Sequence, residues 1–301
     1  MSICRPGDEI LVSDNVYGPT KEISEDLVKE FGINAKFYNP DSFDDLKNKV
    51  TKKTKMLIVE NPGSNTFEFQ DLSKIINLAK RKNILTFLDN TWGTPLYLKP
   101  LTIGFDMSFT SATKYFSGHS DAMGGSLAVN KKVFKKVMFF YKLSGYRLSA
   151  DEAYLIIRGL RTLDVRLKQH YENAKIIINF LKKQKKIKEI LYPYKPNSKN
   201  YKLWKKYYSG ANGLFSIVIK SKNKSSVFKF VNSLKLFGIG YSWGGFESLV
   251  LYQNLRNDTK YTKTRNYFRF AKDEHIVRFH IGLEEPKDLI EDLKKSLRFI
   301  K

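Results

Sequence analysis

Residues 55–89 read KMLIVENPGSNTFEFQDLSKIINLAKRKNILTFLD, and this stretch decides the fold class. It contains two apolar runs of strand length, Lys55–Glu60 and Ile84–Asp89. Between them, Asp71–Lys82 has the periodicity of an amphipathic helix that opens on an Asp cap. A strand, a helix and a second strand in this order predict a parallel β-α-β unit, and such sheets are covered by helices on both faces.

The same alternation continues on both sides of this unit. Further strands are predicted at Glu9–Asp14, Ala35–Tyr38, Met107–Thr110 and Gly125–Val129, with helices at Lys21–Phe31 and Ser42–Val50. The second half is predicted to hold a long helical segment (150–184), a polar stretch (192–210), strands at Gly213–Ile219 and Ile276–Ile281, and helices at Ser226–Leu236 and Pro286–Phe299. We therefore expect an α/β fold, with a large domain in residues 1–158 built on a mostly parallel sheet and a smaller α+β C-terminal domain in residues 159–301.

The composition is strongly basic, because 53 Lys and Arg residues against 30 Asp and Glu residues give a net charge of +23. Basic residues are spread over the whole length, Lys outnumbers Arg, and the abundant residue types share A/T-rich codons. A compositional bias therefore explains the charge, and we expect no nucleic-acid partner, because groove readers favour Arg. A basic binding module stays open as an alternative.

Several other classes of protein are excluded by the sequence. The single cysteine, Cys4, excludes an internal disulfide framework and a Cys-rich zinc site. The four histidines lack metal-ligand spacing, so we expect no metal. Charged residues interrupt every apolar stretch before the roughly 18 residues that a membrane span needs, so we expect a cytoplasmic protein without membrane contact.

Polar side chains follow two of the predicted strands, at the place where open α/β sheets bind their ligands. Asp89-Asn90-Thr91-Trp92 ends one strand, and Ser111-Ala112-Thr113-Lys114-Tyr115 ends another. A carboxylate at the end of an apolar strand is costly unless it is paired; the alternative is that Asp89 caps the next turn. Lys114, taken alone, is one surface lysine among many.

Six short strings, in the same order along the chain, carry a resemblance to a known family. They are Asp89–Trp92, Ser111–Tyr115, Gly118–Asp121, Gly159–Leu163, Tyr241–Leu249 and Arg278–Glu284. The chain resembles the Cys/Met-metabolism family of pyridoxal-phosphate (PLP) enzymes, and within it the cystathionine β-lyases. The resemblance implies a PLP-dependent transferase-like fold (fold type I, aspartate-aminotransferase-like) and PLP as the cofactor.

The resemblance also implies roles for individual residues. Lys114 would hold PLP as a Schiff base and later remove the Cα proton of the substrate, and Asp89 would keep the pyridine nitrogen protonated. The other implied contacts are phosphate binding by Ser111 and Thr113, ring stacking and help in proton transfer by Tyr17, binding of the substrate α-carboxylate by Arg278, and further substrate binding by Tyr241, Ser242 and Trp243. Without the resemblance, Ser111 and Thr113 are turn residues. Tyr17 is then a packing residue and Arg278 a solvated arginine.

The implied reaction is β-elimination of L-cystathionine to homocysteine, pyruvate and ammonia, in methionine biosynthesis. Two local features favour this subtype: the string Pro62-Gly63-Ser64, and the aromatic residues Tyr241 and Trp243 before a double glycine. A cystathionine γ-lyase or γ-synthase stays open as the alternative within the family. The implied partners are a small amino-acid thioether and further copies of this chain, in a homo-oligomer built as a dimer-based tetramer.

The resemblance further implies a segment ahead of Met1. In the family, a strand–turn–helix unit that binds the cofactor phosphate precedes the stretch equivalent to residues 7–9, and an arm before it enters the neighbouring subunit's site. We expect the large domain to be incomplete at its N-terminus and PLP binding to be weakened. A chain that keeps the fold with little or no catalysis is therefore a further alternative.

Overall fold

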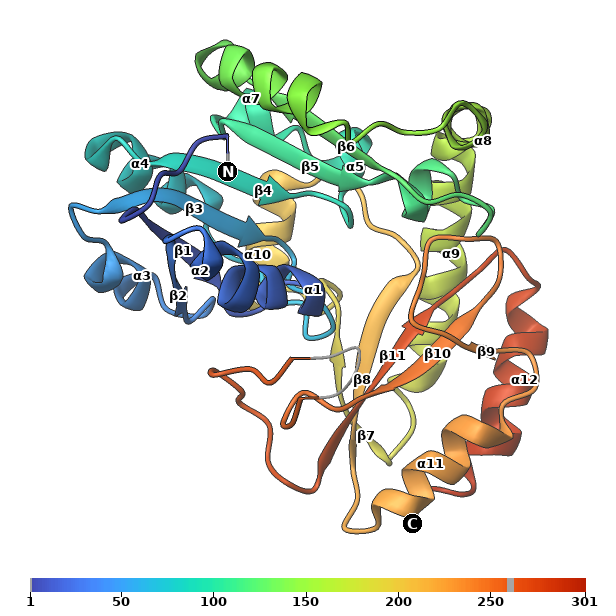
Figure 1. The fold of residues 1–301 in the computed structure, drawn as a ribbon. Coiled ribbons are helices and arrows are strands. Elements are labelled where there is room, and N and C mark those ends of the chain that lie inside the picture. Colours follow the sequence, from blue (N-terminus) through green and yellow to red (C-terminus); the bar gives the residue numbers. More distant parts are fainter. Residues whose placement is uncertain (1, 259–262) are drawn as a thin grey trace.

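The fold is taken from a computed structural model, which describes residues 2–258 and 263–301. A large sheet has the strand order β2-β1-β3-β4-β5-β6. Its strands are β1 (Glu9–Ser13), β2 (Asn34–Tyr38), β3 (Thr54–Glu60), β4 (Leu85–Asp89), β5 (Met107–Ser111) and β6 (Gly125–Val129). Strands β1 to β5 run parallel and β6 runs antiparallel to β5, so the predicted, mostly parallel sheet is confirmed (Figure 1).

Short helices, the π-helical turn η1 and the kinked segment η2 connect these strands. They are α1 (Gly18–Glu22), η1 (Ile23–Leu27), α2 (Val28–Glu30), α3 (Phe43–Lys49), α4 (Leu72–Lys82), α5 (Thr94–Tyr97), α6 (Pro100–Ile103) and η2 (Ala112–Phe116). Lys114, within η2, has non-helical backbone angles (φ −90°, ψ −121°). The helix predicted at Lys21–Phe31 begins earlier, at Gly18, because Pro19 in its first turn has a backbone φ already suited to a helix. The predicted cap Asp71 precedes α4, and its carboxylate accepts hydrogen bonds from Lys206 and Tyr207.

The second half of the chain forms a smaller sheet with the order β7-β8-β11-β10-β9, antiparallel except between β9 and β10. Its strands are β7 (Ile187–Leu191), β8 (Leu214–Lys220), β9 (Gly238–Ile239), β10 (Leu249–Gln253) and β11 (Glu274–His280). The helices are α7 (Lys131–Ser144), α8 (Ala150–Leu160), α9 (Leu163–Leu181), α10 (Lys199–Tyr207), α11 (Lys224–Ser233) and α12 (Pro286–Leu297). The expected domain limit at 158/159 falls in the last turn of α8 and stays a prediction.

The long helix predicted over 150–184 is interrupted between α8 and α9. Thr162, at the break, has non-helical backbone angles (φ −113°, ψ 8°). The side chain of Arg166 stabilises the break, because its Nη2 donates to the carbonyl of Gly159 and its Nε donates to the hydroxyl of Thr162.

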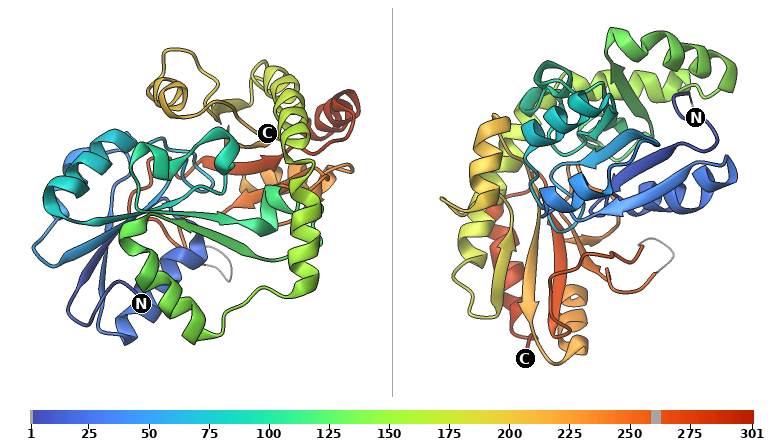
Figure 2. Two further views of the ribbon diagram at one scale, coloured as in Figure 1. Left: turned by 90° about the horizontal axis from the view of Figure 1, so that it is seen from above. Right: turned by 90° about the vertical axis from the view of Figure 1, so that its left-hand side faces the viewer.

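One face of the large sheet is closely packed. Leu57, Val59 and Leu88 are fully buried on this face, in the same core as Phe215 of β8 and Phe279 of β11. The two sheets therefore share one hydrophobic core, and α9 runs alongside both of them (Figure 1, Figure 2).

The opposite face is only partly covered, which corrects the expectation of helices on both faces. Met56, Ile58, Phe87 and Phe109 are half-buried and line an apolar groove of about 270 Å³. The helical segments α1, η1 and α2 reach only part of this face, where Val28 packs against the buried side chains of β1. The described residues therefore leave apolar surface on β3, β4 and β5 in contact with solvent.

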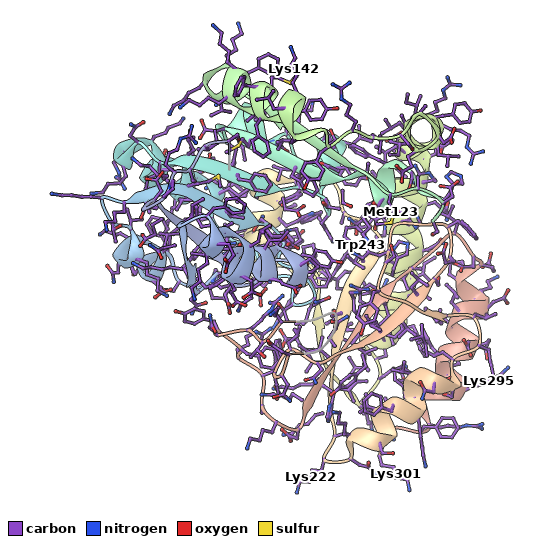
Figure 3. All side chains as sticks on the ribbon, viewed as in Figure 1. Met123, Lys142, Lys222, Trp243, Lys295 and Lys301 are labelled. Atoms are coloured by element: carbon purple, nitrogen blue, oxygen red, sulfur yellow. The ribbon has the colours of Figure 1, made fainter. Side chains whose placement is uncertain are left out.

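Lysines are distributed over the whole surface. Figure 3 shows Lys142 at one end of the molecule and Lys222, Lys295 and Lys301 at the opposite end, all pointing outward. Among the residues that the structure describes, no helix is both long and apolar enough to cross a bilayer.

Candidate active site

Two carboxylates meet at the ends of neighbouring strands. Glu60 ends β3 and Asp89 ends β4, and the parallel register places them opposite each other. Thr91 donates to Oδ1 of Asp89 from its amide (2.9 Å) and from its hydroxyl (2.6 Å). Burial raises the pKa of Asp89, although the bonds from Thr91 oppose this. Burial, together with the charge of Asp89, raises the pKa of Glu60 to about 8, so the pair favours the approach of a cationic group.

Glu60 also fixes the turn that carries Tyr17. Its Oε2 accepts a hydrogen bond from the amide of Tyr17 (2.7 Å), and its Oε1 accepts one from the hydroxyl of Ser64 (2.5 Å). The Tyr17 side chain is 49% exposed and lines a small cavity together with Tyr241 and Arg278. The turn is therefore anchored while the ring remains accessible to a ligand.

Lys114 of η2 reaches from the large sheet to a loop of the smaller sheet. Its Nζ donates to Oγ of Ser242 (2.9 Å) and lies 5.6 Å from the ring centroid of Trp243, which Figure 3 places between the two sheets. The loop comes this close because Gly244 has no side chain: a Cβ there would lie 2.9 Å from the Lys114 carbonyl carbon. Burial, with the nearby charge of Arg278, lowers the pKa of Lys114 to about 8. A lysine with this pKa supplies neutral, nucleophilic amine at a pH where ordinary lysines are charged.

Arg278 lies on β11 and is only 7% exposed. Its Nη2 donates to the carbonyl of Tyr241 (2.7 Å), and its Nη1 donates to Oδ1 of Asn65 (3.3 Å). Burial lowers the pKa of Arg278 to about 10, so the guanidinium stays charged at neutral pH. No carboxylate among the described residues forms an ion pair with it, and its charge is therefore available to an anionic ligand.

The two predicted phosphate donors have different surroundings. The amide of Ser111 donates to Oγ1 of Thr91 (2.9 Å), which links it to the Asp89 carboxylate. The Ser111 hydroxyl makes no hydrogen bond within the described parts of the chain. The Thr113 hydroxyl lies 3.0 Å from the amide nitrogen of Gly124 and 3.3 Å from its carbonyl oxygen. Ser111 is therefore ready to donate, whereas Thr113 would have to exchange an existing bond.

Apart from Thr113, whose hydroxyl is bound to Gly124, the predicted site residues fall into two linked groups. One group contains Lys114, Tyr241, Ser242, Trp243 and Arg278, and the other contains Asp89 and Ser111 with Thr91 and Glu60. Tyr17 connects them, because its amide is bound by Glu60 and its side chain lines the cavity of Arg278. In the described part of the chain, no group of His, Cys, Asp or Glu side chains is arranged to hold a metal ion.

Three residues of the site were not predicted: Glu60, Thr91 and Asn65. Glu60 and Thr91 follow apolar runs in the same way as Asp89, so the strand-end pattern contained the signal for them. Asn65 gave no such signal, because its contact with Arg278 depends on a left-handed backbone (φ 66°) and on the packing of the two sheets.

Comparisons with known proteins identify the family. The model for Cys/Met metabolism PLP-dependent enzymes matches residues 1–298. The chain belongs to this family. A cystathionine beta-lyase of Bordetella avium is 36% identical over 298 residues, which cover 99% of this chain and 73% of that protein. The L-alanine/L-glutamate racemase of Wolbachia pipientis wMel is 35% identical over 298 residues, which cover 99% of this chain and 72% of that protein.

Solved structures of relatives share the fold. A cystathionine gamma synthase from Xanthomonas oryzae pv. oryzae, in complex with cystathionine, superposes with a TM-score of 0.88 at 27% identity. The match covers 99% of this chain and 77% of that one. The expected type I fold of PLP-dependent enzymes is confirmed.

PLP is the cofactor of this PLP-dependent family, and the residues present fit it. The aldehyde of PLP needs a lysine that loses its proton easily, which the lowered pKa of Lys114 provides. Its pyridine nitrogen needs a carboxylate, and Asp89 lies at a strand end beside Glu60. Its phosphate needs hydrogen-bond donors. The Ser111 hydroxyl is one that no described residue already binds.

Proposed function

We propose that this chain is a PLP-dependent carbon–sulfur β-lyase that cleaves L-cystathionine to homocysteine, pyruvate and ammonia. The observation that carries the proposal is the amine of Lys114, which lies between Ser242 and Trp243 with its pKa lowered to about 8 by burial and by Arg278. The β-lyase relative and the Pro-Gly-Ser string after Glu60 support elimination at Cβ rather than at Cγ.

The proposal gives each site residue a role toward the substrate or the cofactor. Arg278 binds the substrate α-carboxylate, which fixes the Cα–H bond near Lys114, and Nζ of Lys114 takes the Cα proton. Bound PLP supplies a cationic, conjugated ring that takes up the electron pair released from Cα. Asp89 would hold the ring nitrogen of the cofactor and keep it protonated. The remaining proposed contacts are the cofactor ring with Tyr17, the phosphate with Ser111 and Thr113, and the substrate with Tyr241, Ser242 and Trp243.

Purified chain incubated with PLP and L-cystathionine tests the proposal. We expect an absorbance band of lysine-bound cofactor and the release of homocysteine and pyruvate in equal amounts. Lys114→Ala should lose the band and at least roughly 10²-fold in rate, whereas Lys295→Ala, at an exposed lysine on α12, should lose neither. A wild-type chain without the band in excess PLP contradicts the proposal, and a Lys114→Ala chain that keeps the band contradicts the role of Lys114.

The racemase relative at 35% identity favours a second candidate, a PLP-dependent amino-acid racemase. This reaction uses the same removal of a Cα proton but breaks no carbon–sulfur bond. A γ-acting enzyme is the third candidate, since a cystathionine gamma synthase shares the fold. Product analysis separates the three, because only β-elimination of cystathionine gives homocysteine with pyruvate.

We also propose that the chain forms a homo-oligomer, as expected for a dimer-based tetramer. Large apolar side chains are exposed along α7, α8 and the segment between them: Phe134, Phe139, Phe140, Tyr141, Leu143, Tyr146, Leu148, Tyr154, Ile157 and Leu160. Figure 1 shows both helices on the outer surface of the molecule. An apolar surface of this extent is typical of a contact between subunits.

A further inference from the structure

Gln253 lies on the same face of the smaller sheet as Arg278. In the antiparallel register Leu251 is opposite Arg278, and Gln253 follows two residues later on β10. Side chains two residues apart on a strand point to the same face, so Gln253 is a diagonal neighbour of Arg278. The side chains of both residues line the cavity at Tyr17 and Tyr241.

The amide of Gln253 is buried without an acceptor. Its side chain is 4% exposed, and Nε2 makes no hydrogen bond with any described residue. A primary amide carries two N–H donors, and a buried donor without a partner is costly. A ligand atom in the adjoining cavity that accepts from this donor would satisfy it.

Two other cationic side chains of the cavity, Lys21 and Arg265, are already engaged. The ammonium of Lys21 is bound by Asp14 (2.6 Å) and by the carbonyl of Thr264 (2.7 Å). Arg265 donates to Ser64 and Thr66 in the loop after β3. Gln253 therefore offers spare donor capacity in a cavity that is rich in positive charge.

We propose that Gln253 is a substrate-binding residue whose amide N–H donates to a carboxylate oxygen of the amino-acid substrate, beside Arg278. The inference rests on the proposed function in one respect, because it takes a thioether amino acid as the ligand. Cystathionine has two carboxylates: one belongs to the half that reacts at Lys114, and the other lies at the distal end. The buried donor of Gln253 suits either carboxylate, and the experiment below shows whether it binds the reacting one or the distal one.

Calorimetric titration of the full chain loaded with PLP tests this site with ligands that lack an amino group and so do not react. Thiodipropionate has two carboxylates, and ethylthiopropionate has one. We expect Gln253→Leu to bind thiodipropionate about tenfold more weakly than the wild type, or weaker still, because a bond to a charged acceptor is lost. Gln253→Glu should bind more weakly again, because it places a like charge beside the ligand. Gln169→Leu, an exposed glutamine on α9, should bind as the wild type does.

The two ligands locate the carboxylate. An equal loss for both ligands in Gln253→Leu assigns the contact to the carboxylate that Arg278 also holds, and a loss for thiodipropionate alone assigns it to the distal one. Gln253→Asn, which keeps the amide but shortens the side chain, should show the same direction of loss and covers the case in which the leucine variant does not fold. Wild-type affinity for both ligands in the folded variants overturns the proposal. Binding that depends on Gln253 in a chain that does not cleave cystathionine refutes the lyase function alone.

Discussion

At the scale of single residues, the charge of Arg278 acts on Lys114. Burial and the charge of Arg278 both lower the pKa of Lys114, to about 8. Without that charge, the pKa of the lysine should move toward its ordinary value of about 10.4. The reactivity of Lys114 toward PLP therefore depends on a residue of the other sheet.

We predict that Arg278→Gln shifts the pH midpoint for attachment of PLP to higher pH, since the amine holds its proton longer. The growth of the absorbance band of bound cofactor at a series of pH values measures this midpoint. The KM for cystathionine should rise roughly 10- to 150-fold, because charge-assisted bonds to the substrate carboxylate are lost. Arg269→Gln, at an exposed arginine paired with Glu189, should change neither quantity; a wild-type pH midpoint in Arg278→Gln contradicts the coupling.

The raised pKa of Glu60 predicts an effect on stability. The pKa is about 8 in the folded chain and about 4.3 in an unfolded one. Between these values the folded state holds a proton that the unfolded state has released. The free energy of unfolding of the cofactor-free protein should therefore fall as the pH rises from about 4.5 to about 8.

We predict that Glu60→Gln flattens this fall, because the amide keeps an acceptor for the Tyr17 N–H and cannot ionise. Urea unfolding of the cofactor-free protein at several pH values measures the slope. Glu291→Gln, at an exposed glutamate on α12, should keep the wild-type slope. A wild-type slope in Glu60→Gln would contradict the raised pKa of Glu60.

The sequence predicted some of these residues better than others. Asp89 and Lys114 were identified from strand-end positions and from family strings, since both signals are local. The role of Glu60 depends on its register with Asp89, and the unsatisfied amide of Gln253 depends on a cavity between two sheets. These features depend on how distant parts of the chain pack together, so no local sequence pattern could have predicted them.

At the scale of elements, the contact between α8 and η2 positions Lys114. Gly159 of α8 lies against the backbone of η2, and a Cβ at this position would lie 2.1 Å from the carbonyl oxygen of Ser117 and 2.3 Å from that of Phe116. These are backbone atoms, so the two elements themselves would have to separate. Position 159 therefore needs glycine because the two backbones are packed closely there, and not because of its own backbone angles.

We predict that Gly159→Ala destabilises the protein by about 1–3 kcal/mol, as overpacking does, and weakens PLP retention because η2 carries Lys114. Urea unfolding and dialysis of the loaded protein measure the two effects. Gly240→Ala is the control for stability, because a Cβ there would lie 3.5 Å from its nearest neighbour, Leu249, which is ordinary contact. Equal stability of the two variants contradicts the packing role of Gly159.

The elements that the sequence predicted are those with a continuous apolar signal. The strands of the large sheet from β1 to β5 were found to within a residue or two, since each is a short apolar run bounded by polar residues. Helix α10 was missed in the polar stretch 192–210. Ser198 caps its N-terminus, which is a local signal, but the contact of Tyr207 with Asp71 cannot be seen in the local sequence. Strand β7 was missed because charged residues, Lys188 and Glu189, interrupt its apolar pattern.

At the scale of the whole molecule, the segment after residue 262 holds the two sheets in their relative position. The carbonyl of Thr264 accepts a bond from Lys21, and the amide of Tyr267 donates to Asp14 (2.8 Å) at the end of β1. Arg265 adds bonds to the loop after β3. The stretch 254–273 was the least predictable from its sequence, and residues 259–262 in it lie outside the described parts. Within this stretch, Thr264, Arg265 and Tyr267 are held by their contacts with the large domain.

The exposed apolar residues on α7 and α8 give the last prediction at this scale. Phe139 and Leu143 are 68% and 71% exposed, so charged substitutions there should not disturb the core of a monomer. In a homo-oligomer that uses this surface, Phe139→Asp with Leu143→Asp buries two charges in the interface and should reduce the assembly to a smaller species. Light scattering coupled to size-exclusion chromatography measures the mass. Leu236→Asp, at an exposed leucine after α11, should leave the mass unchanged, and a wild-type mass in the double variant would place the interface elsewhere.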